Sequence, residues 1–574
     1  MQENTRFKVI IVGAGVTGIT LAHCLARAGI DFVLLDKGVV APSFGTTITL
    51  QPHGCRILHQ LGCLDAVLAK CDTMGGAHCR DPTGKSFAYN DFFGVVRKYA
   101  GYDTRTLDRQ VFLRQLYELL PDKSQVYEKA RVEEIMEEDS IARVILADGR
   151  EFVGDVVVGS DGVHSKVREI MWDKANALRP GMITVNEKRA MVTQYNAIVM
   201  ASSPVPGIGA HDMEITSNDK YSFLLLCQPD WISIIVHSKL PEDQQCTWPT
   251  RRRYTEADME ALVSKISERP VTDTVVFGEL WKRRLKAQMI SLEEGVLEHW
   301  TSGRIVLAGD AVHKVTPNSA LGGNTAMEDA VVITNTLHAL LARHPNKKPS
   351  DVELHDVMRQ EYQDTRVERA RAIVKAGGVL TRQQAYDGWK AYITQRWLTP
   401  IIGLDTLAQK IAGLCVTAPK LNFVEFDERR GILGWQDTME AEKKRAMKGK
   451  VVEKRKAGIA WNNWNGGFEA AFPSHHPLGY RSWFELPSTK LSFLMRGAHE
   501  TERSGGHEKG PDAFHSTCDL WDNHGFFVFR KGFERGAARA RNQVANFSVG
   551  GCWQGVAHFV NGDIVEQAAT DSKK

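Results

Sequence analysis

The chain has 574 residues, a formal net charge of +3, and 43% hydrophobic and 25% charged residues. This length allows two or three domains around a large buried core. A net charge so close to zero gives no indication of nucleic-acid binding. The apolar run Val9 to Val12 is too short for a signal peptide, and no uninterrupted apolar run of about 18 residues predicts a transmembrane helix.

The ten cysteines contain no CxxC pair, so we expect reduced, mostly structural thiols in a cytoplasmic protein. Four of them, Cys55, Cys63, Cys71 and Cys79, recur every eight residues, which is wider than the usual zinc-binding pairs. We therefore predict no metal site. The most membrane-like segment, 397–419, is interrupted by charged residues; core packing is the favoured interpretation, and peripheral contact with an internal membrane is the alternative.

The first motif lies at the N-terminus. Phe7 to Val12 predicts a strand, Gly13-Ala14-Gly15-Val16-Thr17-Gly18 follows it, and a helical pattern extends from Ile19 to Ala28. A second predicted strand, Phe32 to Leu35, ends at Asp36. In this βαβ context the first glycine makes the turn, the second lets the backbone approach a pyrophosphate, and the third allows close packing, while the acidic residue suits a ribose hydroxyl. The pattern predicts dinucleotide binding without separating FAD from NAD.

Three more segments follow before residue 170. Phe44 to Gly54 predicts a strand and a turn that lead into a helix from Cys55 to Leu61. Thr104 to Leu120 is predicted to be a helix, and Arg109 near its start is a candidate for a phosphate, with a solvated face as the alternative. Glu151 to Val158 predicts a strand, and Asp161-Gly162 predicts a turn before the next helix.

Residues 182–240 have alternating apolar runs that predict an antiparallel sheet, at 195–200, 221–227 and 231–237. Such a sheet could form one wall of a pocket. The aromatic candidates to line it are Tyr195, Tyr221, Phe223 and Trp231, and each is equally compatible with a place in the core. A helix is predicted from Glu256 to Ile266.

The second motif begins at Gly309-Asp310. A short strand, Arg304 to Ala308, precedes it, and a loop with Pro317, Gly322 and Gly323 leads to a helix predicted from Thr325 to Arg343. The unpaired N–H groups of a helix N-terminus favour a negative or electron-rich ligand. Asp310 at the strand end is suited to accept a hydrogen bond from a ligand hydroxyl.

Helical patterns continue at 351–376 and 381–397. After Trp435 the composition changes: 439–456 is a charge-dense helical pattern, and 457–574 is rich in Gly, Trp, His and Phe. No mechanistic motif is apparent in this C-terminal part.

The Gly13-x-Gly15-x-x-Gly18, Asp161-Gly162 and Gly309-Asp310 blocks, in this order, resemble the three fingerprints of the aromatic hydroxylase-type (group A) FAD-dependent monooxygenases. The sequence from Asp310 to Asn318 further resembles the corresponding segment of fungal enzymes that epoxidise or hydroxylate meroterpenoids and indole diterpenes. Segments 380–385 and 421–435 fit the same subgroup. The resemblance covers residues 5 to 435.

The resemblance implies roles for particular residues. Asp36 would bind the adenosine ribose of FAD, Arg109 would lie by the pyrophosphate or ribityl chain, and Asp310 would bind a ribityl hydroxyl. Gly322 and Gly323 would bring a helix N-terminus to the flavin pyrimidine edge, where reduced flavin is anionic. Thr49 stands where relatives often have a glycine that contacts FAD through its backbone. The Asp161 block would link FAD and NAD(P)H binding.

The implied chemistry is reduction of FAD by NAD(P)H, addition of O2 to give a C4a-hydroperoxyflavin, and transfer of one oxygen atom to an alkene, indole or phenol. Tyr221 is our candidate for orienting the substrate or relaying a proton, with packing as the alternative. The apolar run Phe223 to Leu226 favours a bulky apolar, prenylated or aromatic substrate. The alternatives are a hydroxylase of small phenolic acids and a flavin-binding partner without catalysis.

These observations predict an α/β protein with a Rossmann-like FAD-binding domain and an antiparallel-sheet substrate domain. The expected segments are FAD-binding at 1–180 and 301–345, substrate-binding at 181–300, helical at 346–438, and a charged linker with an extension of unknown role at 439–574.

Overall fold

The computed structural model describes residues 6–43, 47–138 and 140–445, and further along the chain it gives the backbone of six strands. The chain divides into two compact units, Met1–Trp483 and Phe484–Lys574. Part of the predicted strand that begins at Phe44, and most of the charge-dense pattern at 439–456, lie outside the described residues.

A six-stranded sheet carries the N-terminal motif, in the order β18-β19-β11-β1-β2-β7. All its pairings are parallel except that of β18. The Val and Ile side chains of β1 are buried, which is typical of a parallel sheet with both faces covered. The strands are β18 (Thr301–Ser302), β19 (Ile305–Leu307), β11 (Val156–Gly159), β1 (Lys8–Val12), β2 (Asp31–Leu35) and β7 (Val126–Tyr127). The predicted βαβ unit is confirmed.

Several smaller elements surround this sheet, and α1 and α10 pack against each other beside it. The helices are α1 (Val16–Ala28), α2 (Pro52–Leu61), α3 (Leu64–Leu68), α5 (Arg109–Glu118), α6 (Lys166–Leu178), α7 (Val185–Lys188) and α10 (Gly322–Arg343), with short 3-10 turns η1 (Lys123–Gln125), η3 (Gly309–Ala311) and η4 (Pro317–Ser319). The smaller sheets are β8 (Val132–Glu138), β9 (Ile141–Leu146) and β10 (Glu151–Gly154), and the pair β3 (Thr47–Leu50) and β6 (Arg105–Asp108).

A second, larger sheet has the order β20-β17-β12-β15-β14-β13-β4-β5, and β16 pairs with β12. It confirms the strands predicted at 195–200, 221–227 and 231–237. Two of its strands, β4 and β5, come from the range predicted for the first FAD-binding segment. The strands are β4 (Ala77–Arg80), β5 (Ser86–Asn90), β12 (Val192–Ser202), β13 (Met213–Asn218), β14 (Tyr221–Cys227), β15 (Ile232–Lys239), β16 (Cys246–Thr247), β17 (Arg284–Val296) and β20 (His313–Lys314).

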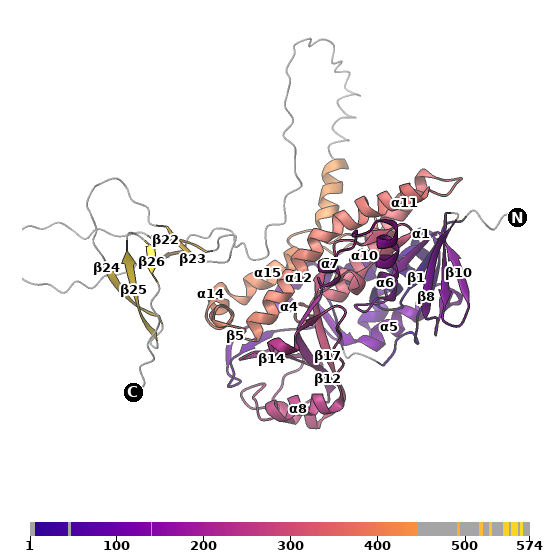
Figure 1. Cartoon of the computed structure of the whole chain (residues 1–574). Coiled ribbons are helices and arrows are strands. Elements are labelled where there is room, and N and C mark those ends of the chain that lie inside the picture. Colours follow the sequence, from indigo (N-terminus) through magenta and orange to yellow (C-terminus); the bar gives the residue numbers. More distant parts are fainter. Residues whose placement is uncertain are drawn as a thin grey trace, which may run out of the picture. The chain divides into compact units, whose positions relative to one another are not determined.

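Side chains of this sheet alternate between two faces. The first, here called the α8 face, includes Ile198 and Phe223 and packs on α8 (Glu256–Ile266) and α9 (Phe277–Lys282). The second, the α15 face, includes Leu224 and packs with residues of α4 (Phe92–Ala100) and α15 (Leu404–Cys415). Figure 1 shows α8 on one side of β14 and the helices α4 and α15 on the other.

The helical region consists of α11 (Asp351–Val357), η5 (Met358–Gln363), α12 (Asp364–Gln384), α13 (Trp389–Ile393), η6 (Thr394–Leu398), α14 (Thr399–Ile402) and α15; the 3-10 turn η2 (Glu242–Gln244) lies earlier in the chain. Helix α15 buries Leu404, Ala408 and Ala412, which supports core packing for the later part of segment 397–419, whereas Trp397 and Ile401 in its first part are exposed. No helix among the described residues combines the length and apolarity needed to cross a bilayer.

The helix predicted from Thr104 is wrong in its first turn. Residues 105–108 form β6, which pairs antiparallel with β3, and the helix begins at Arg109. Asp108 stops the helix from extending further back, because its carboxylate accepts the N–H groups of Gln110 at 2.7 Å and Val111 at 3.3 Å as an N-cap. Helix α10, conversely, begins three residues earlier than predicted, at Gly322.

Candidate active site

The turn between β1 and α1 depends on glycine. Gly13 has φ +103°, and its N–H donates to the carbonyl of Leu35 at 2.7 Å. A Cβ on Gly13 would lie 2.6 Å from the carbonyl oxygen of Ser160, and one on Gly18 would lie 1.9 Å from the carbonyl oxygen of Gly13. These positions exclude side chains because the strand, the turn and the helix approach too closely.

Gly15 differs from both neighbours in the motif. It is the N-cap of α1, and a Cβ built on it would meet no atom within 4 Å. The first turn of α1 has no side-chain cap and no acidic residue. No side chain therefore caps the first N–H groups of α1, and a helix N-terminus of this kind fits a phosphate.

Asp36 lies at the end of β2, beside this turn. Its carboxylate accepts the N–H of Ala14 at 2.7 Å through one oxygen and the N–H of Gly38 at 2.7 Å through the other. The backbone thus holds the carboxylate next to the glycine motif. Its predicted contact with a ribose remains a prediction.

Arg109 is the first residue of α5 and lies within electrostatic reach of Asp36 and Asp310. Burial lowers the pKa of Arg109, and the carboxylates of Asp310, Asp36 and Asp108 act in the opposite direction. Two of these carboxylates bind other cations: Asp108 pairs with Lys286 at 2.5 Å, and Asp310 pairs with Lys314. Among the described residues Arg109 makes no ion pair, so its guanidinium can bind an anionic ligand. The fold therefore brings together Arg109, Asp36 and Asp310.

Asp310 lies in η3, on a loop that is hydrogen-bonded to α10. The N–H of Gly309 donates to the carboxylate of Asp329 at 2.8 Å, and the His313 ring nitrogen Nε2 lies 2.7 Å from the same oxygen. Arg366 donates to the second oxygen of Asp329 at 2.9 Å. Sequence reasoning missed Asp329, because no local spacing links it to the loop.

Gly322 and Gly323 open α10, whose N-terminus has no side-chain cap and no acidic residue in its first turn. The next residue, Asn324, connects this end of α10 to β3 and to the residue that follows it. Its side chain accepts the N–H of Gln51 at 2.9 Å and donates to the carbonyl of Thr49 at 2.8 Å. The Thr49 carbonyl is thus already engaged inside the protein, while its hydroxyl lies 3.0 Å from that of Thr106.

Asp161 follows β11 and caps the start of α6. One oxygen accepts the N–H groups of Lys166 at 2.7 Å and Val167 at 3.2 Å, and the other is buried without a hydrogen-bond partner. Burial raises the pKa of this carboxyl group. The neighbouring Ser160 donates to the carbonyl of Gly13 at 3.0 Å, or to that of Val12 at the same distance, so this block supports the turn of the first motif.

Tyr221 lies on the α8 face of the large sheet. Its ring meets Phe223 edge-on, with 5.6 Å between centroids. Tyr195, by contrast, lies on the α15 face and donates its hydroxyl to Asp387 at 2.6 Å. We therefore leave Tyr221 out of the catalytic machinery proposed below, since it packs with α8 and α9.

A buried ionic cluster joins α10 to α12. Glu328 is fully buried and accepts from Arg369 at 2.6 Å and from Arg366. Burial alone would raise the pKa of Glu328, but the guanidinium groups of Arg369 and Arg366 lower it well below its usual range. His53 of α2 lies 3.4 Å from the same carboxylate, and burial lowers the pKa of this histidine to about 4. The cluster fixes the helix that begins at Gly322.

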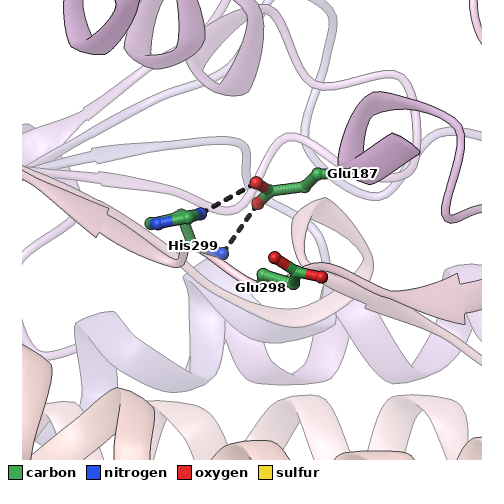
Figure 2. A group of neighbouring side chains, drawn as sticks. All are labelled: Glu187, Glu298 and His299. Carbon is green, nitrogen blue, oxygen red and sulfur yellow. Dashed lines mark hydrogen bonds and ion pairs between the residues drawn. The ribbon is translucent and has the colours of Figure 1, made fainter. Parts of the chain in front are cut away.

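Glu187, Glu298 and His299 bring ligand-type atoms within 4.8 Å of one another (Figure 2). Both oxygens of the buried Glu187 are occupied, by the backbone N–H of His299 at 2.7 Å and by its ring Nδ1 at 2.8 Å. Glu298 is exposed. The group holds α7 against the segment between β17 and β18, and this role accounts for it without an ion.

Comparison with known proteins identifies what this site resembles. A family model described as FAD binding domain matches residues 6–375. The FAD-dependent monooxygenase DEP2 of Fusarium langsethiae is 84% identical over 495 residues, which cover 86% of this chain and 95% of that protein. The FAD-dependent monooxygenase atmM of Aspergillus flavus is 37% identical over 440 residues, which cover 76% of this chain and 90% of that protein.

Solved structures agree in fold. Klebsiella pneumoniae HpxO complexed with FAD and uric acid aligns with a TM-score of 0.57 at 17% identity, over 72% of this chain and 97% of that chain. P. aeruginosa PqsL in complex with 2-aminobenzoylacetate aligns with a TM-score of 0.52 at 20% identity, over 71% of this chain and 99% of that chain. The resemblance, the α/β class and FAD as cofactor are confirmed.

Substitutions at Gly15 and Gly18 should distinguish an effect on FAD binding from an effect on the stability of the fold. Gly15→Ala adds a methyl group to open space, so the flavin-free protein should keep its thermal midpoint, while FAD should bind at least tenfold more weakly, a loss of about 1.4 kcal/mol. Gly18→Ala forces a Cβ against the backbone and should cost roughly 1–3 kcal/mol of unfolding free energy. Thermal melts of flavin-free protein and FAD titrations measure both; unchanged FAD affinity in Gly15→Ala would refute the pyrophosphate site.

Asp310→Ala should weaken FAD binding, because it removes a carboxylate that can accept a ligand hydroxyl. A hydrogen bond to a charged group contributes roughly 1.5–3 kcal/mol, or about 10- to 150-fold in dissociation constant. The flavin absorbance of the purified protein and equilibrium dialysis provide the measurement. Asp230→Ala, an exposed acid in the turn between β14 and β15, is the matched control. If Asp310→Ala retained stoichiometric flavin with unchanged affinity, the assignment of Asp310 to FAD binding would be refuted.

The His299–Glu187 contact should make stability depend on pH. The hydrogen bond to Glu187 raises the pKa of His299 above 6.5. Its contribution is therefore complete below pH 6.5 and disappears as the pH rises through the folded-state pKa. The difference in thermal midpoint between wild type and His299→Gln should be larger at about pH 5.5 than at about pH 8.5. A difference that grows toward high pH would contradict this assignment.

Proposed function

This chain belongs to the FAD-dependent monooxygenases, and from that premise we propose that it uses NAD(P)H and O2 to epoxidise or hydroxylate a bulky apolar small molecule. FAD, when bound, would carry the electrons from NAD(P)H and activate O2 for the transfer of one oxygen atom. The residues of this chain bind the cofactor, place the substrate and keep water out.

Each group of residues would bind a different part of FAD. The N-terminus of α1, with Gly15 at its cap, and the guanidinium of Arg109 would hold the pyrophosphate. Asp36 and Asp310 would bind hydroxyl groups. The uncapped N-terminus of α10, at Gly322, would stabilise negative charge on the reduced ring, because the helix dipole and its free N–H groups favour an anion there.

We propose that the α15 face forms one wall of the substrate pocket. Helix α12 connects this face to the loop that precedes α10, which would lie beside the flavin. Asn318 of that loop donates to Gln384 at 2.5 Å, and Thr381 donates to Asn318 at 2.9 Å or to Thr316 at 2.7 Å. Ala385, which directly follows α12, belongs to the hydrophobic cluster of the α15 face. The loop and this face therefore share the C-terminal end of α12.

The observation that carries the substrate class is that cations beside this face are already paired. Arg382 binds Glu294 at 2.5 Å, and Lys239 binds Asp387 at 2.5 Å. The hydrophobic cluster of this face consists of Ala, Val, Leu, Ile, Met, Cys, Phe and Tyr side chains. A small phenolic acid would need an unpaired Arg or Lys to bind its carboxylate. An apolar substrate fits better.

Flavin spectra test the proposed activity. The oxidised flavin bands should bleach under anaerobic NADPH or NADH and return when oxygen is admitted, with dithionite as a positive control for reduction. With prenylated aromatic compounds, mass spectrometry should find one atom from labelled O2 in the product. Simple phenolic acids should give no product and serve as the comparison set. Failure of both nucleotides to reduce the flavin, with and without apolar compounds, would overturn the proposal, as would oxygenation of phenolic acids alone.

A further inference from the structure

The helical segment that follows α12 carries apolar side chains on its solvent side. Residues 389–402 are helical throughout, as α13, η6 and α14 in succession. Trp389, Ile393, Trp397 and Ile401 follow one another every four residues, a spacing that places them along one side of a helix. All four are exposed, Trp389 to 66% and Ile401 to 70%. We call this row of side chains the Trp389–Ile401 stripe.

The polar side of the same segment is the buried one. Gln395 and Thr399, which again lie four residues apart, are 4% and 6% exposed. The Thr399 hydroxyl donates to the carbonyl of Thr394 at 3.1 Å, and the Gln395 amide interacts with the thiol of Cys79 in β4. A surface helix ordinarily turns its apolar side to the core and its polar side to water. This segment is turned the other way, which indicates that a partner covers its exposed side.

Positive charge accompanies the exposed rings. From 388 to 401 the sequence contains Lys390 and Arg396 and no Asp or Glu. The Nζ of Lys390 lies 5.5 Å from the ring centre of Trp389, and the guanidinium carbon of Arg396 lies 4.8 Å from that of Trp397. Each cation thus lies beside an exposed indole. This combination suits the boundary of a bilayer, where the rings reach the acyl chains and the cations meet the phosphates.

The acidic side chains next to this segment are engaged within the protein. Asp387, just before it, pairs with a lysine of β15 at 2.5 Å. Asp405, just after it, accepts from the side-chain amide of Asn90 at 2.6 Å, and Asp81 lies 4.0 Å from Arg396. The exposed side of the segment is therefore apolar and basic, which complements the negative surface of an anionic membrane.

The stripe adjoins the proposed substrate wall. Ala385 at the end of α12 belongs to the hydrophobic cluster of the α15 face, and so does Leu404, which follows α14. The ring of Tyr392 in α13 meets that of Tyr386 edge-on, with 5.0 Å between centroids. An apolar substrate concentrates in lipid, so a bilayer at this surface would present the substrate beside the wall.

We propose that the Trp389–Ile401 stripe is a membrane-binding surface. The segment lies in the plane of an anionic bilayer, with its indole and isoleucine side chains among the outermost acyl carbons and Lys390 and Arg396 at the phosphates. Transfer of the substrate from the bilayer to the α15 face rests on the proposed function. The docking surface itself rests on the exposed side chains and their charges.

Sedimentation of the FAD-loaded full chain with vesicles tests this surface without relying on turnover. One set of vesicles contains equal parts of phosphatidylcholine and phosphatidylserine, and the other contains phosphatidylcholine alone. Trp389→Ala/Trp397→Ala should keep its flavin and bind the mixed vesicles at least about tenfold more weakly, because two indoles lose their burial in lipid. The matched control, Leu178→Ala/Val352→Ala, removes two exposed apolar side chains of α6 and α11 and should stay within about twofold of wild type.

Two single variants separate the contributions of charge and apolar area. Lys390→Gln should weaken binding to the mixed vesicles alone, since only these carry net negative charge. Ile401→Gln should weaken binding to both sets, and it tests the stripe even if the double tryptophan variant loses its flavin. The charge-dense segment 439–456 is the same in every variant, so a difference between variants arises from the helical segment.

The inference is overturned if wild type binds neither set of vesicles, or if the double tryptophan variant and Ile401→Gln bind as tightly as the control. It is also overturned if light scattering without lipid finds a wild-type dimer that the double tryptophan variant dissociates, because a second copy of the chain would then cover the stripe. These results leave reduction of the flavin by NAD(P)H untouched. A wild-type flavin that neither nucleotide reduces removes the proposed function and leaves the vesicle binding standing.

Discussion

The buried contacts of Arg366 and Arg369 with Glu328 and Asp329 hold the active-site scaffold together. All four side chains are almost completely buried, and the two acids are adjacent on α10. Removing one partner from such a cluster leaves an uncompensated charge in a low-dielectric interior, which costs roughly 3–5 kcal/mol. The cluster does more than join two helices, because Asp329 also accepts the N–H of Gly309. The position of the Asp310 loop, and of the helix N-terminus at Gly322, therefore depends on buried charges of α10 and α12.

The proposed FAD site is assembled from pieces that are distant in the chain, and each piece is positioned by a contact of a different kind. The glycine turn at Gly13 is determined by close backbone approach, and Asp36 by two backbone N–H groups. Arg109 is the first residue of α5, after the Asp108 N-cap, and lies within electrostatic reach of Asp36 and Asp310. Asn324 connects α10 to β3 through its amide. These contacts connect residues that lie far apart in the sequence.

Two surfaces with opposite chemistry border the flavin loop. The α15 face is apolar, and the cations beside it are neutralised by carboxylates, which suits a substrate without charge. A pocket at Arg168, Lys188 and Trp248 is cationic and aromatic. The Glu187–His299 contact positions α7 and with it Lys188.

Local sequence alone determined the parts of the protein that depend on neighbouring residues. The turn Gly13 to Gly18 was predictable because a βαβ unit closes within some thirty residues, and β14 and α8 were predictable from periodicity alone. The face on which Tyr221 lies was decided by how the whole sheet packs, and it turned this candidate toward α8. The strand at 105–108, the partners of Arg109 and the role of Asn324 were decided by pairings with distant residues. Such pairings produce no recognisable spacing in the sequence, because the two partners are far apart in the chain and meet only in the folded protein.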